Sequence, residues 1–490
     1  MIHWTWPVHR YVRGFRAIIL ALPLSCVTVD LEPPVTPVEP GPEICLEERL
    51  LDTLPLEVEP SVSPSGRHAG YALKERMIVD GHPGETFDSL GKLTFSEDGD
   101  HWGYTARVGN RWFRVCDGEK IECPGEPYRV EFDLQNRQVP YLTLHGKPDL
   151  LRMPPCSVEI DGIESPIWEA ISRIVSDDRH TRTAYFGRQG SQLFPVIDGI
   201  ESEPFQANLN IRPGLNILPT PGTVYEEPSV SRDGRHVGYV IPENGRYRLV
   251  IDDVKGPLLD GVSGPWFSDD GSRVGSFEHR GGKWHAVVDG VVNLRFEVKG
   301  DHWCFSPTLD HVAWVESEEG RKRVVVDGIP GPWFVDLNHF QFSPDGRHVA
   351  YLATETEKPG RIMGWLTDGC VVKDGRPLGP EHEGVYPITF SPDSRRIAYA
   401  TGRGERHFLI CEEREAGPYD YVHVPVFSPD SRHLCFEAKR AGKHLVVVDG
   451  RDSEPVDRII GGPRFSRDGR HVGYGALIGR ELWWKVISVP

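Results

Sequence analysis

Histidine and aspartate recur at fixed places in this chain, and both residue types can bind metal ions. The recurring histidines are His68, His101, His236, His311, His348, His433 and His471. The recurring aspartates are Asp98, Asp233, Asp270, Asp345, Asp393, Asp430 and Asp468. A ring of histidines could ligate a metal, but the acidic turns lack the fuller D-x-D-x-D-G spacing of a calcium loop. Aspartates commonly cap their own turns, and a histidine between stacked sheets commonly bonds a neighbouring turn. We therefore predict scaffold roles, with no metal and no cofactor.

Known catalytic patterns are incomplete in this sequence. The segment nearest to a G-x-S-x-G nucleophile elbow is 261–265, where Pro265 replaces the last glycine. The segment nearest to the zinc motif H-E-x-x-H is 382–386, where Tyr386 replaces the second histidine. There is no C-x-x-C, phosphate loop or dinucleotide fingerprint. We predict no catalytic residues and a protein that is not an enzyme.

A repeated phrase determines which elements carry these residues. It reads FSPDGRHVAY at 342–351, FSPDSRRIAY at 390–399 and FSRDGRHVGY at 465–474, and a second phrase such as VVVDG at 324–328 follows it. Eight clear copies and three worn ones make eleven. Their reference positions are Ser63, Ser96, Asp133, Ser176, Ser231, Ser268, Ser306, Ser343, Ser391, Ser428 and Ser466.

Each copy has the pattern of four short strands. In 348–351, His348 and Ala350 alternate with Val349 and Tyr351, which is the period of a strand with two distinct faces. Asp-Gly occurs twice in a consensus copy and favours tight hairpins. Four antiparallel strands in about 40 residues predict the blade of a β-propeller. The predicted fold class is therefore all-β.

The phrase F-S-P-D-G-R-x-[VI]-A-[YF] resembles the TolB-type, WD-like propeller repeat of bacterial proteins. The resemblance covers roughly 48–490 and implies a propeller fold, while it implies little about function. The chain departs from TolB itself because it has more copies than a six-bladed propeller needs and shows no amino-terminal α/β domain. The hydrolase domain in which peptidase relatives of this propeller keep their catalysis is likewise not expected here.

Eleven blades exceed the usual four to eight, so we expect two propellers. Blades at 48–205 would form the first and about seven blades at 229–490 the second, with the Pro-rich insertion 206–228 as linker. A different split or one large ring is the alternative. The last copy stops after its third strand, and residues 49–58 precede the first copy, so the two ends are expected to share one blade.

The first residues resemble an export signal. Arg10, Arg13 and Arg16 precede an apolar run at 17–25, which is too short to span a bilayer, and Cys26 follows. We predict a signal peptide at 1–26, lipid attachment at Cys26 and a Pro-rich tether at 27–47. The protein would be an exported envelope lipoprotein, periplasmic or at the outer membrane, touching the membrane only through this anchor. The alternative is a cytosolic protein with an incorrectly assigned start.

Charge and cysteine content limit the partners and the redox state. The formal net charge of −17 and the lack of a Lys/Arg block argue against nucleic-acid binding. Most cysteines are expected to be buried thiols. Cys116 and Cys123 flank a predicted hairpin and are the best pair for a disulfide.

Aromatic residues and insertions are the remaining candidates for a site. Trp266 and Trp333 each follow Gly-Pro in the sequence GPWF, and we expect them at equivalent places in their repeats. They are the predicted binding residues, and the alternative is that they fill space between blades. The insertions 203–228, 355–370 and 379–386 would be surface loops, where binding often resides. The predicted function is non-catalytic binding of a protein or peptide partner. The alternative is an enzyme that acts on glycans or peptides through carboxylates at the axial funnel, and a small-ligand or metal sensor is a weaker third option.

Overall fold

Each repeat folds into a four-stranded antiparallel sheet, as the alternating pattern predicts. In the fifth blade the strands are β21 (Ser229–Val230), β22 (Val237–Glu243), β23 (Arg246–Ile251) and β24 (Val254–Lys255), hydrogen-bonded in that order. Residues 237–241 of β22 are all buried, on both faces of the strand. Neighbouring blades cover both faces of the sheet, which is how repeat units without a core of their own become stable.

The computed structural model describes residues 46–489 with internal gaps. The gaps are 56–57, 97, 124, 128–140, 146–154, 161–162, 178–180, 207–226, 293–296, 299–300, 356–366, 380–381, 386–387 and 413. The predicted signal peptide, Cys26 and most of the tether therefore lie outside the described residues.

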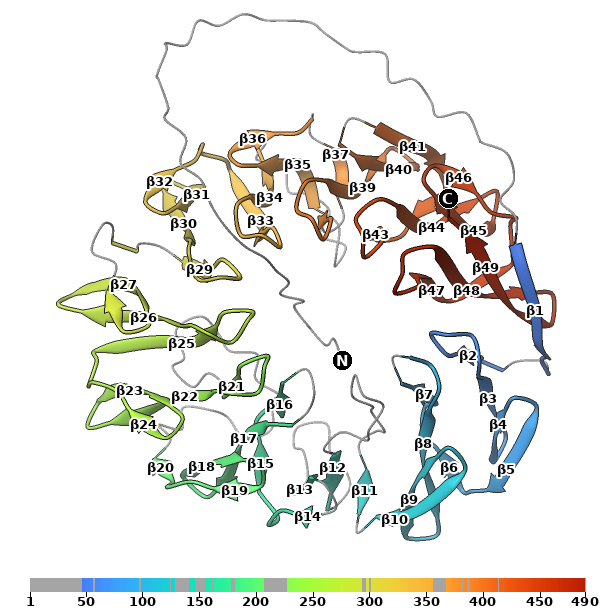
Figure 1. The fold of residues 1–490 in the computed structure, drawn as a ribbon, viewed down its shortest axis with the longest axis horizontal. Helices are drawn as coiled ribbons and strands as arrows, with labels where there is room; N and C mark the ends of the chain where they lie inside the picture. Colours follow the sequence, from blue (N-terminus) through green and yellow to red (C-terminus); the bar gives the residue numbers. More distant parts are fainter. Residues whose placement is uncertain are drawn as a thin grey trace, which may run out of the picture.

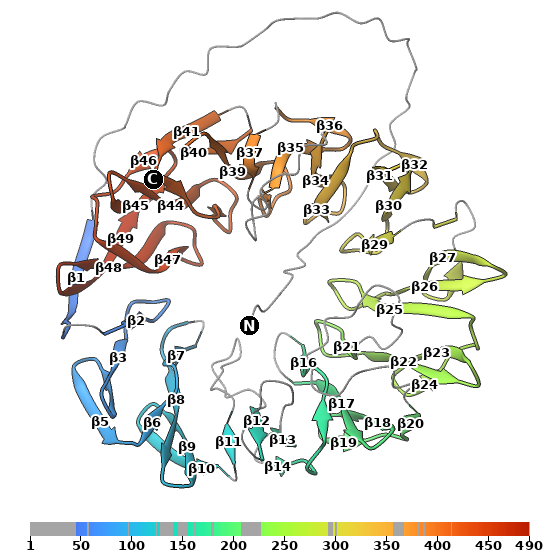
Figure 2. The ribbon, with the colours of Figure 1, turned by 180° about the vertical axis from the view of Figure 1, so that it is seen from behind.

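The described residues form eleven blades around one axis (Figures 1 and 2). The blades span 61–86, 89–123, 126–164, 170–206, 229–255, 261–292, 301–330, 336–377, 382–419, 421–452 and, together with 46–53, 458–488. Blades 8 and 9 are joined into one nine-stranded sheet because β35 (Thr367–Lys373) pairs with β37 (His382–Val385). No helix occurs in the described ranges. The all-β propeller predicted from the repeat is confirmed.

The expectation of two propellers is wrong, and the alternative of one large ring is correct. The blades on either side of the long insertion pack directly against each other. Phe186 and Phe205 of blade 4 share a buried cluster with Tyr239 and Ile241 of blade 5. The rings of Phe186 and Tyr239 meet edge-to-face with centroids 5.9 Å apart. Blades 4 and 5 are therefore direct neighbours in one ring, and no boundary between two propellers falls between them.

A hydrogen-bond network holds the first phrase of each repeat to the second. In blade 5, Ser231 Oγ donates to Asp233 Oδ1 at 2.7 Å and accepts from the backbone N–H of His236 at 2.8 Å. His236 Nδ1 bonds Asp252 Oδ2 at 2.6 Å, and the other oxygen of Asp252 accepts from the Val237 backbone N–H at 2.9 Å. The same His–Asp bond recurs at five further pairs, which are His68–Asp80, His101–Asp117, His311–Asp327, His348–Asp374 and His433–Asp449.

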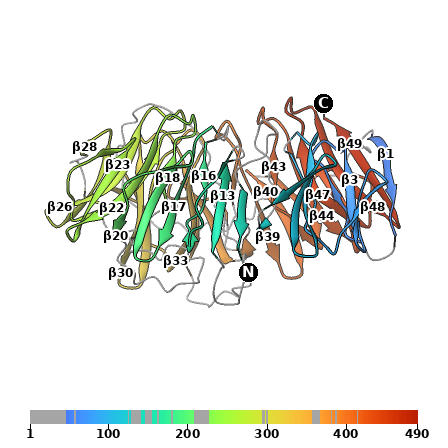
Figure 3. The ribbon, with the colours of Figure 1, turned by 90° about the horizontal axis from the view of Figure 1, so that it is seen from below.

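The S-x-D-G turns of successive blades lie side by side on one face of the ring. Asp345 N–H donates to Ser394 Oγ at 2.8 Å between blades 8 and 9, and Asp393 N–H donates to Ser431 Oγ at 2.9 Å between blades 9 and 10. Because the His–Asp bonds tie each V-x-D-G turn to this same end of its blade, both kinds of turn share one face. We call it the turn face. Figure 3 shows the ring edge-on as a flat disc, with strands running between its two faces.

The two ends of the described chain close the ring, as predicted. β1 (Leu46–Thr53) pairs antiparallel with β49 (Glu481–Ser488) and completes the blade of β47 (Arg458–Phe465) and β48 (His471–Ile478). Lys485 of β49 is only 1% exposed, and its ammonium group pairs with Glu48 of β1 and, at 3.5 Å, with Glu454. β1 thus covers the edge of β49 that the last repeat alone would leave unpaired.

Candidate functional site

The recurring histidines and aspartates belong to the scaffold network described above. Within the described ranges, no group of three or more His, Cys, Asp or Glu side chains is arranged to hold a metal ion. The two near-motifs lie on strands. Residues 261–265 belong to β25 (Gly261–Phe267), and His382 is a buried residue of β37, where burial lowers its pKa. Neither segment forms the strand-turn-helix or helix that its motif requires.

The predicted disulfide is wrong because the strand register separates the two thiols. Cys116 ends β9 (Arg111–Cys116), whereas Cys123 pairs with Trp112 near the start of that strand. Disulfides need Cα atoms within about 4.4–6.8 Å, and this separation along the strand exceeds that range. Both cysteines are buried free thiols. Burial raises the pKa of Cys116 to about 11 and also raises that of Cys123, so both stay protonated.

Trp266 lies in the packing between blades 6 and 7. It belongs to β25, the innermost strand of its blade, and its ring lies 5.2 Å from Phe277 and 5.7 Å from Phe305. Phe277 is fully buried, and three further tryptophans, Trp284, Trp303 and Trp314, belong to the same cluster. This environment favours the space-filling interpretation for Trp266.

Trp333 occupies a different place in the repeat, so the equivalence expected from GPWF is wrong. It lies in the segment between β32 (Ile329–Pro330) of blade 7 and β33 (Asp336–Phe342) of blade 8. The Arg323 guanidinium stacks over its ring at 4.3 Å from the centroid. Arg323 Nε and Nη2 also donate to Glu316 Oε2 at 2.8 and 2.6 Å. Trp333, Arg323 and Glu316 therefore form one ordered group, held together by the stacking contact and the ion pair.

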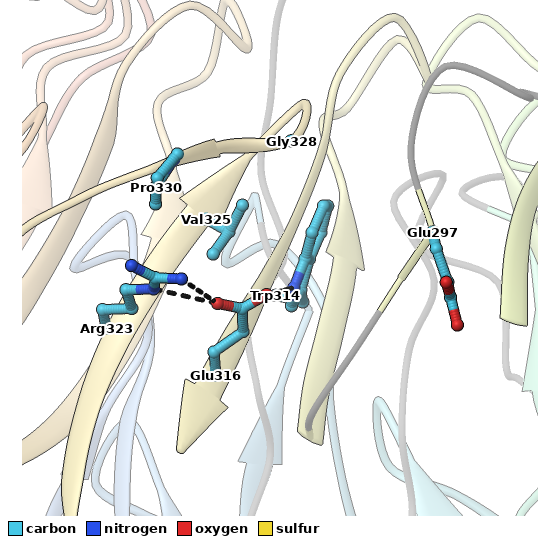
Figure 4. A pocket seen from close by; sticks show the side chains of 7 residues that line it. All are labelled: Glu297, Trp314, Glu316, Arg323, Val325, Gly328 and Pro330. Carbon is cyan, nitrogen blue, oxygen red and sulfur yellow. Dashed lines mark hydrogen bonds and ion pairs between the residues drawn. The ribbon is translucent and has the colours of Figure 1, made fainter. Parts of the chain in front are cut away.

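A cleft of about 210 Å³ adjoins this arrangement (Figure 4). Its lining residues are Glu297, Trp314, Glu316, Arg323, Val325, Gly328 and Pro330. Trp314 Nε1 donates to the second oxygen of Glu316 at 3.3 Å, and Lys283 Nζ pairs with Glu297 at 2.9 Å. Both carboxylates therefore have a cationic partner. Sites for drug-sized ligands usually exceed 300 Å³, so the cleft suits one side chain of a protein or peptide.

The chain also presents a surface feature that the sequence reasoning missed. The outermost strand of ten blades begins directly after the V-x-D-G turn, at what we call the rim position. Five consecutive blades carry an exposed aliphatic residue there. These are Ile163, Ile200, Val254, Val291 and Ile329, each 69–75% exposed. The signal was present in the sequence as Asp-Gly followed by Ile or Val in four of these blades and as Asp-Asp followed by Val254 in the fifth. Only the structure shows that these side chains are exposed.

The predicted binding loops are mostly undescribed. Most of 203–228 and 355–370 and part of 379–386 lie in the gaps. Within the described ranges there is no helix that is long and apolar enough to cross a bilayer.

Comparison with known proteins adds no argument to the fold described above. No family model matches the sequence, and no curated protein matches it. Among solved structures, one titled "Crystal structure of the eukaryotic initiation factor" is 11% identical, covers 87% of this chain and 92% of its own, and has a TM-score of 0.37. "Structure of Dos1 propeller" is 9% identical, covers 82% and 93%, and has a TM-score of 0.30. A Kuenenia stuttgartiensis hydrazine synthase is 12% identical, covers 64% and 94%, and has a TM-score of 0.22. Likenesses this low carry no argument about activity. The fold itself defines the chain as an eleven-bladed β-propeller.

Proposed function

We propose that this chain is a non-catalytic, exported propeller scaffold that binds a protein or peptide partner at the cell envelope. The observation that carries the binding proposal is the cleft beside Trp333 and Arg323. An aromatic ring stacked on an ion-paired arginine is a rigid pair of the residue types that dominate binding energy at interfaces. The cleft beside it has the size of one side chain.

The mechanism we propose is insertion of one apolar partner side chain against Pro330, above a floor of the cleft formed by Trp314 and Val325, which are each 2% exposed. The ion pair of Arg323 and Glu316 would stay in place and order the wall of the cleft. Because both charged groups are already paired, binding would not require a new charge to be buried.

The location of the protein is a separate part of the proposal. The basic residues before the apolar run at 17–25 support export, and Cys26 after small Ser25 supports lipid attachment. The repeat supports a relation to TolB-type bacterial propellers. The Cys26→Ala variant should lose radiolabelled palmitate incorporation, and unchanged labelling would refute the anchor.

A pull-down from native envelopes tests partner binding. Tagged mature protein should recover one stoichiometric partner, and Trp333→Ala or Arg323→Ala should reduce its recovery by about tenfold or more, as hot-spot truncation does. The matched control is Arg248→Ala. Arg248 has the equivalent strand position in blade 5 and forms an ion pair with Glu243. Among the described residues, no tryptophan stacks on its guanidinium group.

Two outcomes would contradict the proposal. Equal loss in the Arg248→Ala control would show that recovery depends on blade integrity and not on the cleft. If no partner is recovered and the wild-type protein turns over a glycan or peptide library, the protein would be an enzyme and not a binding scaffold.

A further inference from the structure

The aliphatic rim residues occupy one geometric place in five adjacent blades. Single exposed apolar residues scattered over a surface are ordinary. Here the same position is filled by Ile or Val in blades 3 to 7 without interruption. We call Ile163, Ile200, Val254, Val291 and Ile329 the aliphatic rim set.

All five side chains stand at the turn face. Each follows the tight turn that leads into the outermost strand, and in blades 4 to 7 an aspartate of this turn accepts a bond from the backbone at the start of the second strand. The turn before Ile163 lies outside the described residues. Beside Val254, for example, Asp252 accepts from His236 and from the Val237 backbone N–H. Beside Ile329, Asp327 does the same with His311 and Val312. The carboxylates of Asp252 and Asp327 therefore point toward the second strand of their blades, and both oxygens of each are already hydrogen-bonded.

The next three blades carry arginine at the rim position. Arg376, Arg414 and Arg451 are exposed, and no hydrogen bond or ion pair within the described ranges engages their guanidinium groups. We call them the arginine rim set. Free guanidinium groups match phosphate oxygens in geometry and charge. One face therefore presents an arc of aliphatic side chains followed by an arc of arginines.

The aliphatic side chains are separated from one another by the architecture. Each outermost strand belongs to the sheet of its own blade and pairs with no neighbouring outermost strand. A protein interface usually needs a contiguous, water-excluding core. A bilayer accepts separated aliphatic side chains that project from one face, and it offers phosphates at the same level.

The eleventh blade adds an independent observation. Its outermost strand is β1, and Leu46 at the start of β1 pairs with Ile487 near the end of β49. Leu46 therefore stands where the rim residue stands in the other ten blades. The chain enters the ring at the turn face, so a lipid at Cys26 would hold this same face toward the membrane.

We propose that the turn face lies directly on a lipid bilayer. The aliphatic rim set inserts among the upper acyl chains, and the arginine rim set contacts lipid phosphates. This contact goes beyond an anchor at the amino terminus, and it requires neither acylation of Cys26 nor a protein partner.

Vesicle sedimentation tests the proposal with the full chain carrying Cys26→Ala. This parent should bind phosphatidylcholine vesicles and bind more when phosphatidylglycerol is added. Ile200→Asp, Val254→Asp and Val291→Asp combined should lower the partition coefficient by at least about tenfold, because insertion scales with buried apolar area. The matched control combines Val108→Asp and Ile478→Asp, which are 43% and 39% exposed and end the second strand of their blades at the opposite face.

The arginine rim set is tested separately. Arg376→Glu, Arg414→Glu and Arg451→Glu combined should remove the gain from phosphatidylglycerol and its sensitivity to salt, while leaving binding to phosphatidylcholine alone. Unchanged urea midpoints would show that each variant is folded.

Three results would overturn the proposal. The parent could fail to bind vesicles, the triple aspartate variant could bind as well as the parent, or the control could lose as much binding. A dimer that the triple aspartate variant abolishes, seen by sedimentation velocity without vesicle binding, would instead assign the face to a second copy of the chain.

Discussion

Ring closure depends on a buried lysine whose two partners come from different parts of the chain. Lys485 is 1% exposed, whereas the side chains of Glu48 and Glu454 are 35% and 59% exposed. Replacing both carboxylates, by Glu48→Gln and Glu454→Gln, would leave the ammonium group buried without a countercharge. Removing the partner of a buried charge lowers the free energy of unfolding by about 3–5 kcal/mol. We expect a loss of about 3 kcal/mol here, because both carboxylates are partly exposed to water.

Removing the lysine charge should cost less than removing its partners. Lys485→Met keeps most of the side-chain volume and eliminates the buried charge, while both glutamates can still reach water. We expect a loss of about 1 kcal/mol or less. Single Glu48→Gln should fall between the two, because Glu454 remains 3.5 Å from the ammonium group.

Urea unfolding monitored by tryptophan fluorescence checks this order. Trp483 and Trp484 directly precede Lys485 in β49 and report on the closure blade. Limited proteolysis near residue 46 would report opening of β1 in the same samples. A Lys485→Met variant at least as unstable as the double glutamine variant would refute the reasoning, since the cost would then come from packing and not from an uncompensated charge.

Two further predictions concern titrating groups. The hydrogen bond to Asp327 raises the pKa of His311, so its contribution to stability is present below the unfolded pKa of about 6.5 and is lost as pH rises through the higher folded value. Because His311 is more than a third exposed, His311→Gln should cost only about 0.5 kcal/mol at low pH and less at high pH, a difference visible in urea midpoints; an equal cost at both pH values would contradict it. Cys116 and Cys123 should resist alkylation in the native protein near pH 8 and react after denaturation, because burial keeps both thiols protonated; a mobility shift on reduction would instead reveal a disulfide.

The sequence predicted the elements better than their assembly into a site. The eleven copies, the four strands in each and the completion of the last blade by β1 were all predicted correctly. The positions of single side chains were harder to predict. Trp266 and Trp333 share the sequence GPWF, yet one lies in an inner strand and the other between two blades. Counting from the reference serines, Ser268 and Ser343, would have separated them, since Trp266 stands two residues before its serine and Trp333 ten.

The sequence by itself determined the repeating unit, which is one four-stranded blade. Asp-Gly turns, alternating strands and the Ser–Asp–His phrase act within about forty residues, so they can be recognised without knowledge of the rest of the chain. The number of blades in one ring is decided by the small angle between neighbouring blades, and that angle comes from side chains such as Phe186 and Tyr239 meeting across an interface. The same is true of exposure, because Ile200 and Val250 look alike as apolar strand residues, but only Val250 has a blade packed over it. Only the tertiary structure therefore showed that the eleven repeats form one ring and that the turn face carries an arc of exposed aliphatic residues.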